Sequence, residues 1–246
     1  MTGRAETALA AAARIGPYFV WEPGRRYRDI SDLSDPVVLA ERVGDARRLL
    51  NRMGAGNPED RVVASTVFLG LTARLVSAPL AAAVIGGAVP VADPDRMGWR
   101  PVPSGPIPIV YEHLETSAAD HATALVAVIG TLVTPMLEAF RTRFVLSPQV
   151  LWGNVASALG GAHTMIAQAA PEHAAGSAAL VGELLARAPL AGTATLHRPD
   201  PGRDRWFLVR NNCCLYYRIP GGGTCGDCVL VPPADRARQW RAMLSR

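Results

Sequence analysis

All four cysteines of this 246-residue chain lie within sixteen positions near its C-terminus, at Cys213, Cys214, Cys225 and Cys228. Unrelated cysteines would be scattered along the chain and mostly buried singly as small hydrophobic side chains. The spacing C-C-x10-C-x2-C is instead typical of a set of metal ligands. Gly221 to Gly223 separate the two pairs, so the chain can double back there and bring the pairs face to face as a cysteine hairpin.

The backbone around the cysteines is expected to be irregular. Side chains alternate between faces along a regular strand, so Cys213 and Cys214 cannot both face one centre from such a strand. In the run from Cys225 to Cys228, Gly226 can adopt the left-handed conformation and turn both thiols to one side. Backbone N–H groups would then be free to point at the sulfur atoms.

Three interpretations of the four cysteines can be weighed. Zinc is usually held by two C-x2-C pairs, and the adjacent first pair departs from that pattern. Two disulfides would not persist in a reducing cytosol. A [2Fe–2S] cluster also takes four thiolates, and its two irons can be shared between neighbouring cysteines. The residues therefore favour an iron–sulfur cluster and leave zinc as the alternative.

The cysteine spacing, the aromatic residues after the first pair and the glycine-rich turn together resemble the FhuF-type ferric-siderophore reductases. The resemblance covers about the last forty residues, with a fainter similarity at Val150 to Asn154. It implies that Cys213, Cys214, Cys225 and Cys228 bind a [2Fe–2S] cluster. It also implies an enzyme, an iron–sulfur oxidoreductase that delivers one electron to ferric iron held by a siderophore.

We therefore expect a cytoplasmic reductase of ferric siderophores that takes its electron from a ferredoxin-like or other donor. Hydroxamate or catecholate oxygens hold Fe³⁺ tightly, and reduction to Fe²⁺ weakens those bonds and releases the iron. The alternative is a zinc-stapled module that binds a small ligand or a protein without redox activity.

The substrate is expected close to the cysteines, beside arginines that are near them in the chain. Arg205, Arg210 and Arg218 are the candidates, because a guanidinium can balance the charge of a cluster or bind an anionic ligand, and Arg210 is nearest to the thiolates in the chain. Strand alternation from Arg205 onward places Arg210 on the same face as Trp206 and Leu208. A simple solvated arginine is the competing interpretation of Arg210.

Trp152 and Asn154, in the faintly similar stretch, are further candidates for substrate binding. His163 follows Trp152 by about three helical turns, so these three residues are expected to border one cleft. A place in the core is the competing interpretation of Trp152, because large aromatic side chains dominate cores. The five histidines show no H-E-x-x-H spacing, and the chain has no G-x-G-x-x-G, P-loop or G-x-S-x-G motif.

Composition narrows the class of protein further. With 49% hydrophobic and 19% charged residues, the chain is long enough for one large or two small globular domains. A formal net charge of +4 with dispersed arginines does not indicate nucleic-acid binding. The apolar run Leu9 to Ala13 is too short for a signal peptide. Leu75 to Ala92 contains Pro79 and Pro90, so we expect at most peripheral membrane contact.

The expected fold class is α+β, mainly helical, with a small β-sheet and the C-terminal cysteine hairpin. Residues 1–112 form an N-terminal α/β region, and residues 113–246 a helical C-terminal region that contains the cluster-binding segment 211–230. Helices are expected over 6–15, 36–53, 57–75, 76–86, 118–145, 148–170, 173–188 and from Asp235, which caps the last one. Strands are expected at 18–21, 27–30, 88–92 and 107–111, and a hairpin at 193–196 and 205–209.

Particular residues sharpen these expectations. Asp35 followed by Pro36 predicts a helix start, and the apolar stripe of that helix is Leu39, Val43, Ala46, Leu50 and Met53. Two following helices are almost entirely apolar and should be buried, which leaves Arg74 in need of a partner. Pro135 should kink the helix over 118–145. The proline-rich stretch 93–106 is expected to be a loop, and Arg236, Arg238 and Arg241 should face solvent from the last helix.

Overall fold

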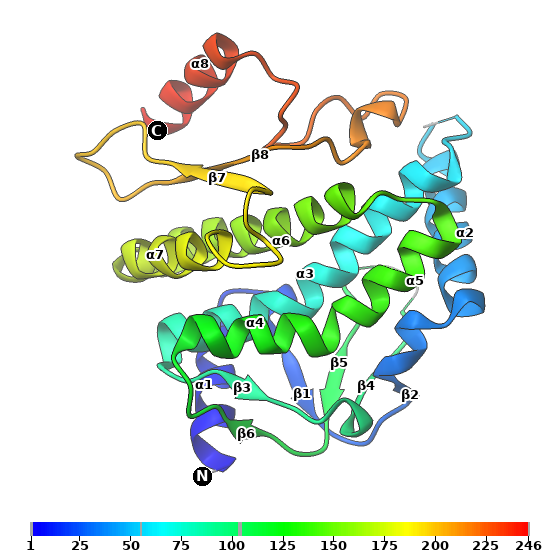
Figure 1. Ribbon diagram of the computed structural model, residues 1–246, viewed down its shortest axis with the longest axis vertical. Coiled ribbons are helices and arrows are strands. Elements are labelled where there is room, and N and C mark those ends of the chain that lie inside the picture. Colours follow the sequence, from blue (N-terminus) through cyan, green and yellow to red (C-terminus); the bar gives the residue numbers. More distant parts are fainter. Residues whose placement is uncertain (1, 55, 103–104, 246) are drawn as a thin grey trace.

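The computed structural model describes residues 2–54, 56–102 and 105–245. It confirms an α+β fold that is mainly helical (Figure 1). The α-helices are α1 Thr2–Ala13, α2 Pro36–Arg52, α3 Asp60–Gly86, α4 His121–Leu132, α5 Thr134–Phe144, α6 Pro148–Ala169, α7 Ala174–Leu185 and α8 Pro233–Leu244. Short 3-10 turns are η1 Pro17–Phe19, η2 Ile30–Ser34, η3 Pro94–Arg96, η4 Pro171–His173 and η5 Tyr216–Arg218.

The central element is α3, which packs against α1, α2, α4 and α6. It is a single helix, so the expectation of two helices was wrong. Pro79 lies inside it and removes one backbone hydrogen bond, but neighbouring helices enclose that turn and hold it in place. By length and composition α3 could cross a membrane, as could α4 and α5 taken as one bent span. However, 72% of the apolar window of α3 is buried inside the protein, as in the core helix of a globular fold.

Arg74 is a charged side chain in the middle of this apolar helix, and it is only 3% exposed. Its Nε, Nη1 and Nη2 donate to the carbonyls of Ile107, Pro17 and Val20 at 2.6, 2.7 and 2.8 Å. Burial lowers the pKa of Arg74 to about 10, so it stays charged. The predicted need for a partner is thus met by backbone carbonyls, which tie α3 to the N-terminal segment and to the sheet.

The main sheet has four short strands, β1 Trp21–Pro23, β2 Arg28–Asp29, β4 Met97–Trp99 and β5 Ile109–Tyr111, in the order β1-β5-β4-β2. The β1–β5 pair is parallel and the other pairs are antiparallel. Strand β4 lies within 93–106, where a loop was expected, because three residues are too few to show a strand period. Pro103 and Ser104 of that stretch lie outside the described residues. A second pair joins β3 Pro90–Val91 to β6 Glu115–Thr116.

Helix boundaries follow the predicted signals closely. The Asp35 carboxylate accepts from the N–H groups of Val37 and Val38 at 2.7 and 3.1 Å and caps α2. Met53, assigned to the buried stripe of α2, is 74% exposed because the helix has already ended. The predicted kink near Pro135 is a 43° bend between α4 and α5.

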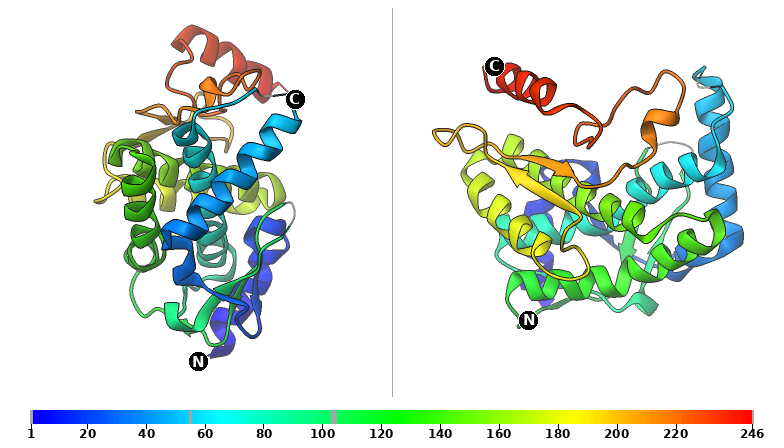
Figure 2. Two further views of the ribbon diagram at one scale, coloured as in Figure 1. Left: turned by 90° about the vertical axis from the view of Figure 1, so that its right-hand side faces the viewer. Right: turned by 45° about the horizontal axis from the view of Figure 1, so that its top comes forward.

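The C-terminal part forms a layer over α6 (Figures 1 and 2). The predicted hairpin is present, with β7 Ala194–His197 antiparallel to β8 Phe207–Arg210. Gly160 of α6 lets β8 approach, since a Cβ there would lie 2.6 Å from Leu208 Cδ1. The last helix, α8, begins at Pro233 with Pro232 as its cap, so Asp235 is a first-turn residue and not the cap.

One hydrophobic core runs through the body, from Ala5 in α1 to Leu208 in β8. Helix α3, from the region 1–112, makes its most extensive contacts with α6, from the region 113–246. The division of the sequence at residue 112 therefore remains a prediction, and the two regions fold around shared apolar contacts.

Candidate metal centre and adjoining cleft

The cysteine segment, residues 211–230, has an irregular backbone, as expected. Strand β8 ends at Arg210, Leu215 has a left-handed φ of 69°, and the chain then enters η5. The reversal uses Gly221 and Gly223, with φ of 76° and 68°. Gly226 is not in the left-handed region, so that expectation was wrong. The turn is closed instead by the Cys228 N–H, which donates to the Cys225 carbonyl at 3.2 Å, and such a turn forms with negative φ values.

Two cysteines from opposite halves of the segment are in direct contact. The Cys214 and Cys225 sulfur atoms lie 3.4 Å apart. Thiolates bound to one tetrahedral metal at about 2.3 Å would lie about 3.8 Å apart, so this pair is close to the spacing of two ligands of one iron. The hydrogen bond between the two thiols lowers the pKa of Cys214 to about 6 and raises the pKa of Cys225.

Of the other two cysteines, Cys213 is partly exposed and Cys228 is buried. Burial raises the pKa of Cys213, and the nearby thiols of Cys214 and Cys228 raise it further. The N–H of Leu215 donates to Cys213 Sγ at 3.3 Å, and the N–H of Leu230 donates to Cys228 Sγ at 3.4 Å. These bonds confirm the expectation that backbone N–H groups point at sulfur, and such bonds tune iron–sulfur centres.

Cys214 and Cys225 are in contact, but the four cysteines are not grouped around a single point. Within the described parts of the chain, no three Cys, His, Asp or Glu side chains are placed to hold one metal ion. A structural zinc site would need four ligands around one ion, whereas a [2Fe–2S] centre takes two ligands on each of two irons. The contact between Cys214 and Cys225 agrees with two ligands of one metal in either group.

A buried chain of hydrogen bonds fastens the cysteine segment to the helices. Ser65 Oγ on α3 donates to the Cys214 carbonyl at 2.8 Å. On α6, Asn154 Nδ2 donates to the Ser65 carbonyl and to Ser65 Oγ at 2.9 and 3.0 Å. Asn154 Oδ1 in turn accepts from Arg210 Nη2 at 2.6 Å. Ile219 adds an apolar contact with Val62 of α3.

This geometry corrects the expected roles of two candidate substrate residues. Asn154 and Arg210 are 0% and 1% exposed, so neither faces a site that a solvent-borne ligand can enter. The interpretation of Arg210 as a solvated arginine is wrong for the same reason. Strand alternation in β8 did place Arg210 on the Leu208 face, and both side chains are buried against α6.

Two further candidates lie in different surroundings. Arg218 is at the surface and pairs with Glu59 at 3.2 Å, so it remains a candidate for substrate binding. Trp152 is half-buried and packs against the core. It does not share a cleft with His163, because neither Trp152 nor Asn154 lines the cleft that His163 borders, which is described below. The predicted common cleft of Trp152, Asn154 and His163 is therefore wrong.

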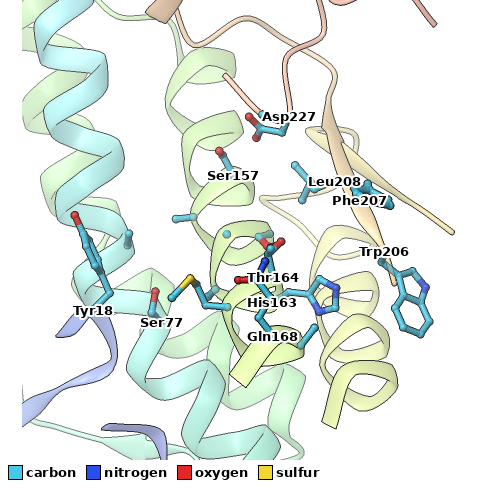
Figure 3. A pocket seen from close by; sticks show the side chains of 18 of the residues that line it. Tyr18, Ser77, Ser157, His163, Thr164, Gln168, Trp206, Phe207, Leu208 and Asp227 are labelled. Atoms are coloured by element: carbon cyan, nitrogen blue, oxygen red, sulfur yellow. Dashed lines mark hydrogen bonds between the residues drawn. The ribbon is translucent and has the colours of Figure 1, made fainter. Parts of the chain in front are cut away.

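A large cleft of about 1030 Å³ lies beside the cysteine segment. Its walls come from η1, α3, α6 and β8, and it extends to Gly226 and Asp227, between two of the cysteines (Figure 3). Most of the lining is apolar or small. The uncharged polar side chains that reach it include Tyr18, Thr66, Ser77, Ser157, Thr164 and Gln168.

His163 is the histidine that lines this cleft, and it is 1% exposed. Its Nδ1 lies 3.1 Å from Ser177 Oγ, and its ring meets Trp206 edge to face at 6.0 Å between centroids. Burial lowers the pKa of His163 to about 4, so the ring is neutral near pH 7. Sequence reasoning singled out His163 but missed Asp227 and Tyr18, which no spacing or motif connects to α6.

Comparison with known families agrees with the site. Residues 210–230 match the family model described as the FhuF 2Fe-2S C-terminal domain. No curated protein matches the chain. The matched stretch contains all four cysteines and supports a [2Fe–2S] cluster as the cofactor over zinc, while the individual ligands remain a prediction. Residues 210–230 of this protein are therefore similar to the FhuF-type 2Fe–2S C-terminal domain, and the cofactor that this segment indicates is a [2Fe–2S] cluster.

Proposed function

We propose that this protein is a cytoplasmic reductase of ferric siderophores. The observation that supports this most directly is the cleft of about 1030 Å³ that extends to Gly226 and Asp227, between Cys225 and Cys228. A ligand in the cleft would lie against the backbone that carries two thiolates. The [2Fe–2S] cluster, when bound, supplies the single electron.

The cleft has the size and lining that a siderophore complex requires. Pockets for drug-sized ligands measure about 300–1,000 Å³ and are mostly apolar with a few polar groups. The hydroxyls of Ser157 and Thr164 and the amide of Gln168 project from α6 toward it (Figure 3). These neutral groups can hydrogen-bond the oxygens of an organic chelator, while the apolar walls exclude water from it.

The proposed reaction, reduction of the chelated iron, needs one electron and no proton. Fe³⁺ in the chelate becomes Fe²⁺, and the hard oxygen ligands then bind the less charged ion more weakly. The electron comes from a separate donor protein. Residues 198–246 carry nine arginines and only four acidic residues, whereas residues 1–197 carry sixteen arginines and seventeen acidic residues. This positive C-terminal part favours a small acidic redox protein of the ferredoxin type as the donor.

The proposal is tested by anaerobic reduction of ferric siderophores. The protein is reduced with dithionite, freed of excess reductant and mixed with ferric hydroxamate or ferric catecholate complexes. We expect the visible absorbance of the oxidised cluster to return as a ferrous chelator captures one Fe²⁺ per cluster. If the reduced protein transfers no electron to either class, the proposed function is wrong.

A variant that fills the cleft links this activity to the site. Thr164→Trp places a large side chain in the cleft at an exposed position of α6. Thr131→Trp makes the same change at an exposed position of α4 outside the cleft lining. We expect slower electron transfer only in Thr164→Trp, with the cluster spectrum unchanged in both variants. Equal rates in the two variants would place the substrate elsewhere.

A further inference from the structure

Among the residues that the structure describes, two arginines are almost fully buried, and they differ in how their N–H groups are used. Arg74 is 3% exposed and all three of its nitrogens donate to backbone carbonyls. Arg210 is 1% exposed, and only its Nη2 donates, to Asn154 Oδ1 at 2.6 Å and to the Val150 carbonyl at 3.4 Å. Among the described residues, Nε and Nη1 of Arg210 are buried without any hydrogen-bond partner.

Such an arrangement is unfavourable for a protein without its cofactor. Each buried donor left unpaired destabilises the protein, and more so when it is charged. No carboxylate in the described parts of the chain forms an ion pair with Arg210 within 4.0 Å. The buried guanidinium is therefore not paired with any carboxylate of the described residues.

Arg210 lies near enough to the cysteine segment for its charge to act on two of the thiols. The positive charge of Arg210 lowers the pKa values of both Cys213 and Cys214, although burial and a hydrogen bond respectively are the larger influences on them. The backbone N–H of Arg210 also donates to the Asp227 carbonyl at 3.0 Å, in the loop between Cys225 and Cys228. Arg210 thus lies beside both halves of the cysteine segment.

The surroundings hold Arg210 in this place. Asn154 fixes Nη2, and Asn154 is itself fixed by Ser65 on α3. Gly153 makes room, since a Cβ at that position would lie 3.0 Å from Arg210 Nη2 and 2.1 Å from Asn212 Oδ1. The site is therefore built from α3, α6 and β8 to present a buried cation to the cysteines.

We propose that the Nε–H and Nη1–H of Arg210 are hydrogen-bond donors to the sulfur atoms of the [2Fe–2S] cluster, and that this positioning residue sets its reduction potential. Four thiolates and two sulfides outweigh the charge of two ferric ions, and reduction adds one more negative charge. A buried cation stabilises the reduced form more than the oxidised form, so it raises the potential. This inference rests on the cofactor and does not depend on siderophore reduction.

The test uses Arg210→Met, which keeps an unbranched apolar stem and removes the guanidinium, and Arg210→Gln, which keeps one polar group. Potentials are measured by anaerobic redox titration, followed by visible circular dichroism, without any siderophore. We expect both variants to have a lower potential than the wild type. We also expect iron release to a chelator to be roughly 10- to 100-fold faster, as for other groups that support metal ligands.

The thermal stability of the metal-free protein gives a second readout, which should not fall when Arg210 is replaced. Without the cluster, Arg210→Met removes an unpaired buried charge, so we expect the melting temperature of the apo variant to equal or exceed that of the apo wild type. A purely structural arginine would lower it. An apo variant that is unfolded or less stable would overturn the proposal, whether or not the cluster can be titrated.

Arg218→Met is the matched control. Arg218 also lies on the cysteine segment, and the substitution removes the same charge from an exposed ion pair with Glu59. Solvent screens this charge, so we expect a smaller shift of potential than in the Arg210 variants. Equal shifts from Arg210 and Arg218 would show a general charge effect and would overturn the hydrogen-bonding role of Arg210. An unchanged potential in Arg210→Met would overturn it directly.

Discussion

The helical body and the cysteine segment are stabilised by different means. In the body, α3 is surrounded by helices, and large side chains such as Phe68 and Phe140 are fully buried and packed edge to face. In the cysteine segment, most side chains are at least partly exposed, and the fully buried ones are Cys214, Ile219 and Cys228. Apolar burial contributes about 1.5–3 kcal/mol for each large side chain, so the body is stable by packing alone.

The segment must obtain its order from elsewhere. It has a few hydrogen bonds to α3 and α6 and one short 3-10 turn. Binding of a metal group to such a site is in part folding energy. We therefore expect a scaffold that folds without metal, joined to a segment whose order depends on its cofactor, and each of the following experiments separates the two.

The largest effect is expected from Cys228→Ser. This change removes a buried thiol of the segment, so we expect loss of the cluster absorbance and faster amide hydrogen exchange over residues 216–230. Far-UV circular dichroism should show the helical body still folded. Wild-type protein stripped with a chelator is the control and should exchange in the same way. Wild-type exchange rates in the variant would contradict a cofactor-dependent segment.

Phe68→Ala tests the body. The ring of Phe68 is 0% exposed and contacts the ring of Phe140 with 5.2 Å between centroids. Its removal leaves a cavity, so we expect the free energy of unfolding to fall by about 3–5 kcal/mol. Urea denaturation of the apo protein measures this change. Tyr27→Ala, at a side chain that is 73% exposed, is the control and should change stability by less than about 0.5 kcal/mol. Similar losses in both variants would mean that the core is not where the stability lies.

His163 tests the packing between the body and the β7–β8 hairpin. Its folded-state pKa is about 4, below the ordinary 6.5, because the ring is buried. The unfolded chain therefore takes up a proton first as the pH falls, and stability decreases from about pH 6.5 down to about pH 4. The total loss should be about 2 to 3 kcal/mol. Stability of the apo protein and of apo His163→Gln is compared across this range, and parallel curves would contradict the buried neutral histidine.

Gly153→Ala tests the junction between the two regions. A Cβ would clash with Asn212 Oδ1 at 2.1 Å, so the segment should shift at a cost of about 1–3 kcal/mol. We expect faster extraction of iron by a chelator, with the helical body intact. Gly161→Ala on the same helix meets no atom within 4 Å and should be neutral or stabilising by up to about 1 kcal/mol. Equal iron loss from both variants would show that the junction does not hold the segment.

Local signals in the sequence were sufficient for several elements. The cap and proline at Asp35 and Pro36 located the start of α2, Pro135 located the bend between α4 and α5, and the glycines 221–223 located the reversal. Each of these depends on the conformational limits of one or two residues. The cysteine spacing was specific enough to indicate the cofactor before the fold was known.

Features that depend on distant neighbours were not predictable. The continuity of α3 through Pro79 depends on the helices that enclose it, and the β1–β5 pair joins strands that are far apart in the chain. Arg210 was expected near the cysteines, but its burial depends on α6 and on the absence of a side chain at Gly153. The cleft combines residues from both ends of the chain, so no window of sequence contains it.

Helix α6 has a consequence for the rate of electron transfer. It carries Asn154, which helps to hold the cysteine segment, and Ser157 to Gln168, which line the cleft. Tunnelling rates depend steeply on the separation between donor and acceptor. Because the same α-helix contacts the cysteine segment and lines the cleft, it fixes the distance between the cluster and a ligand in the cleft while ligands enter and leave. Substitutions in the exposed loops should therefore alter how often substrate binds and leave the tunnelling step itself unchanged.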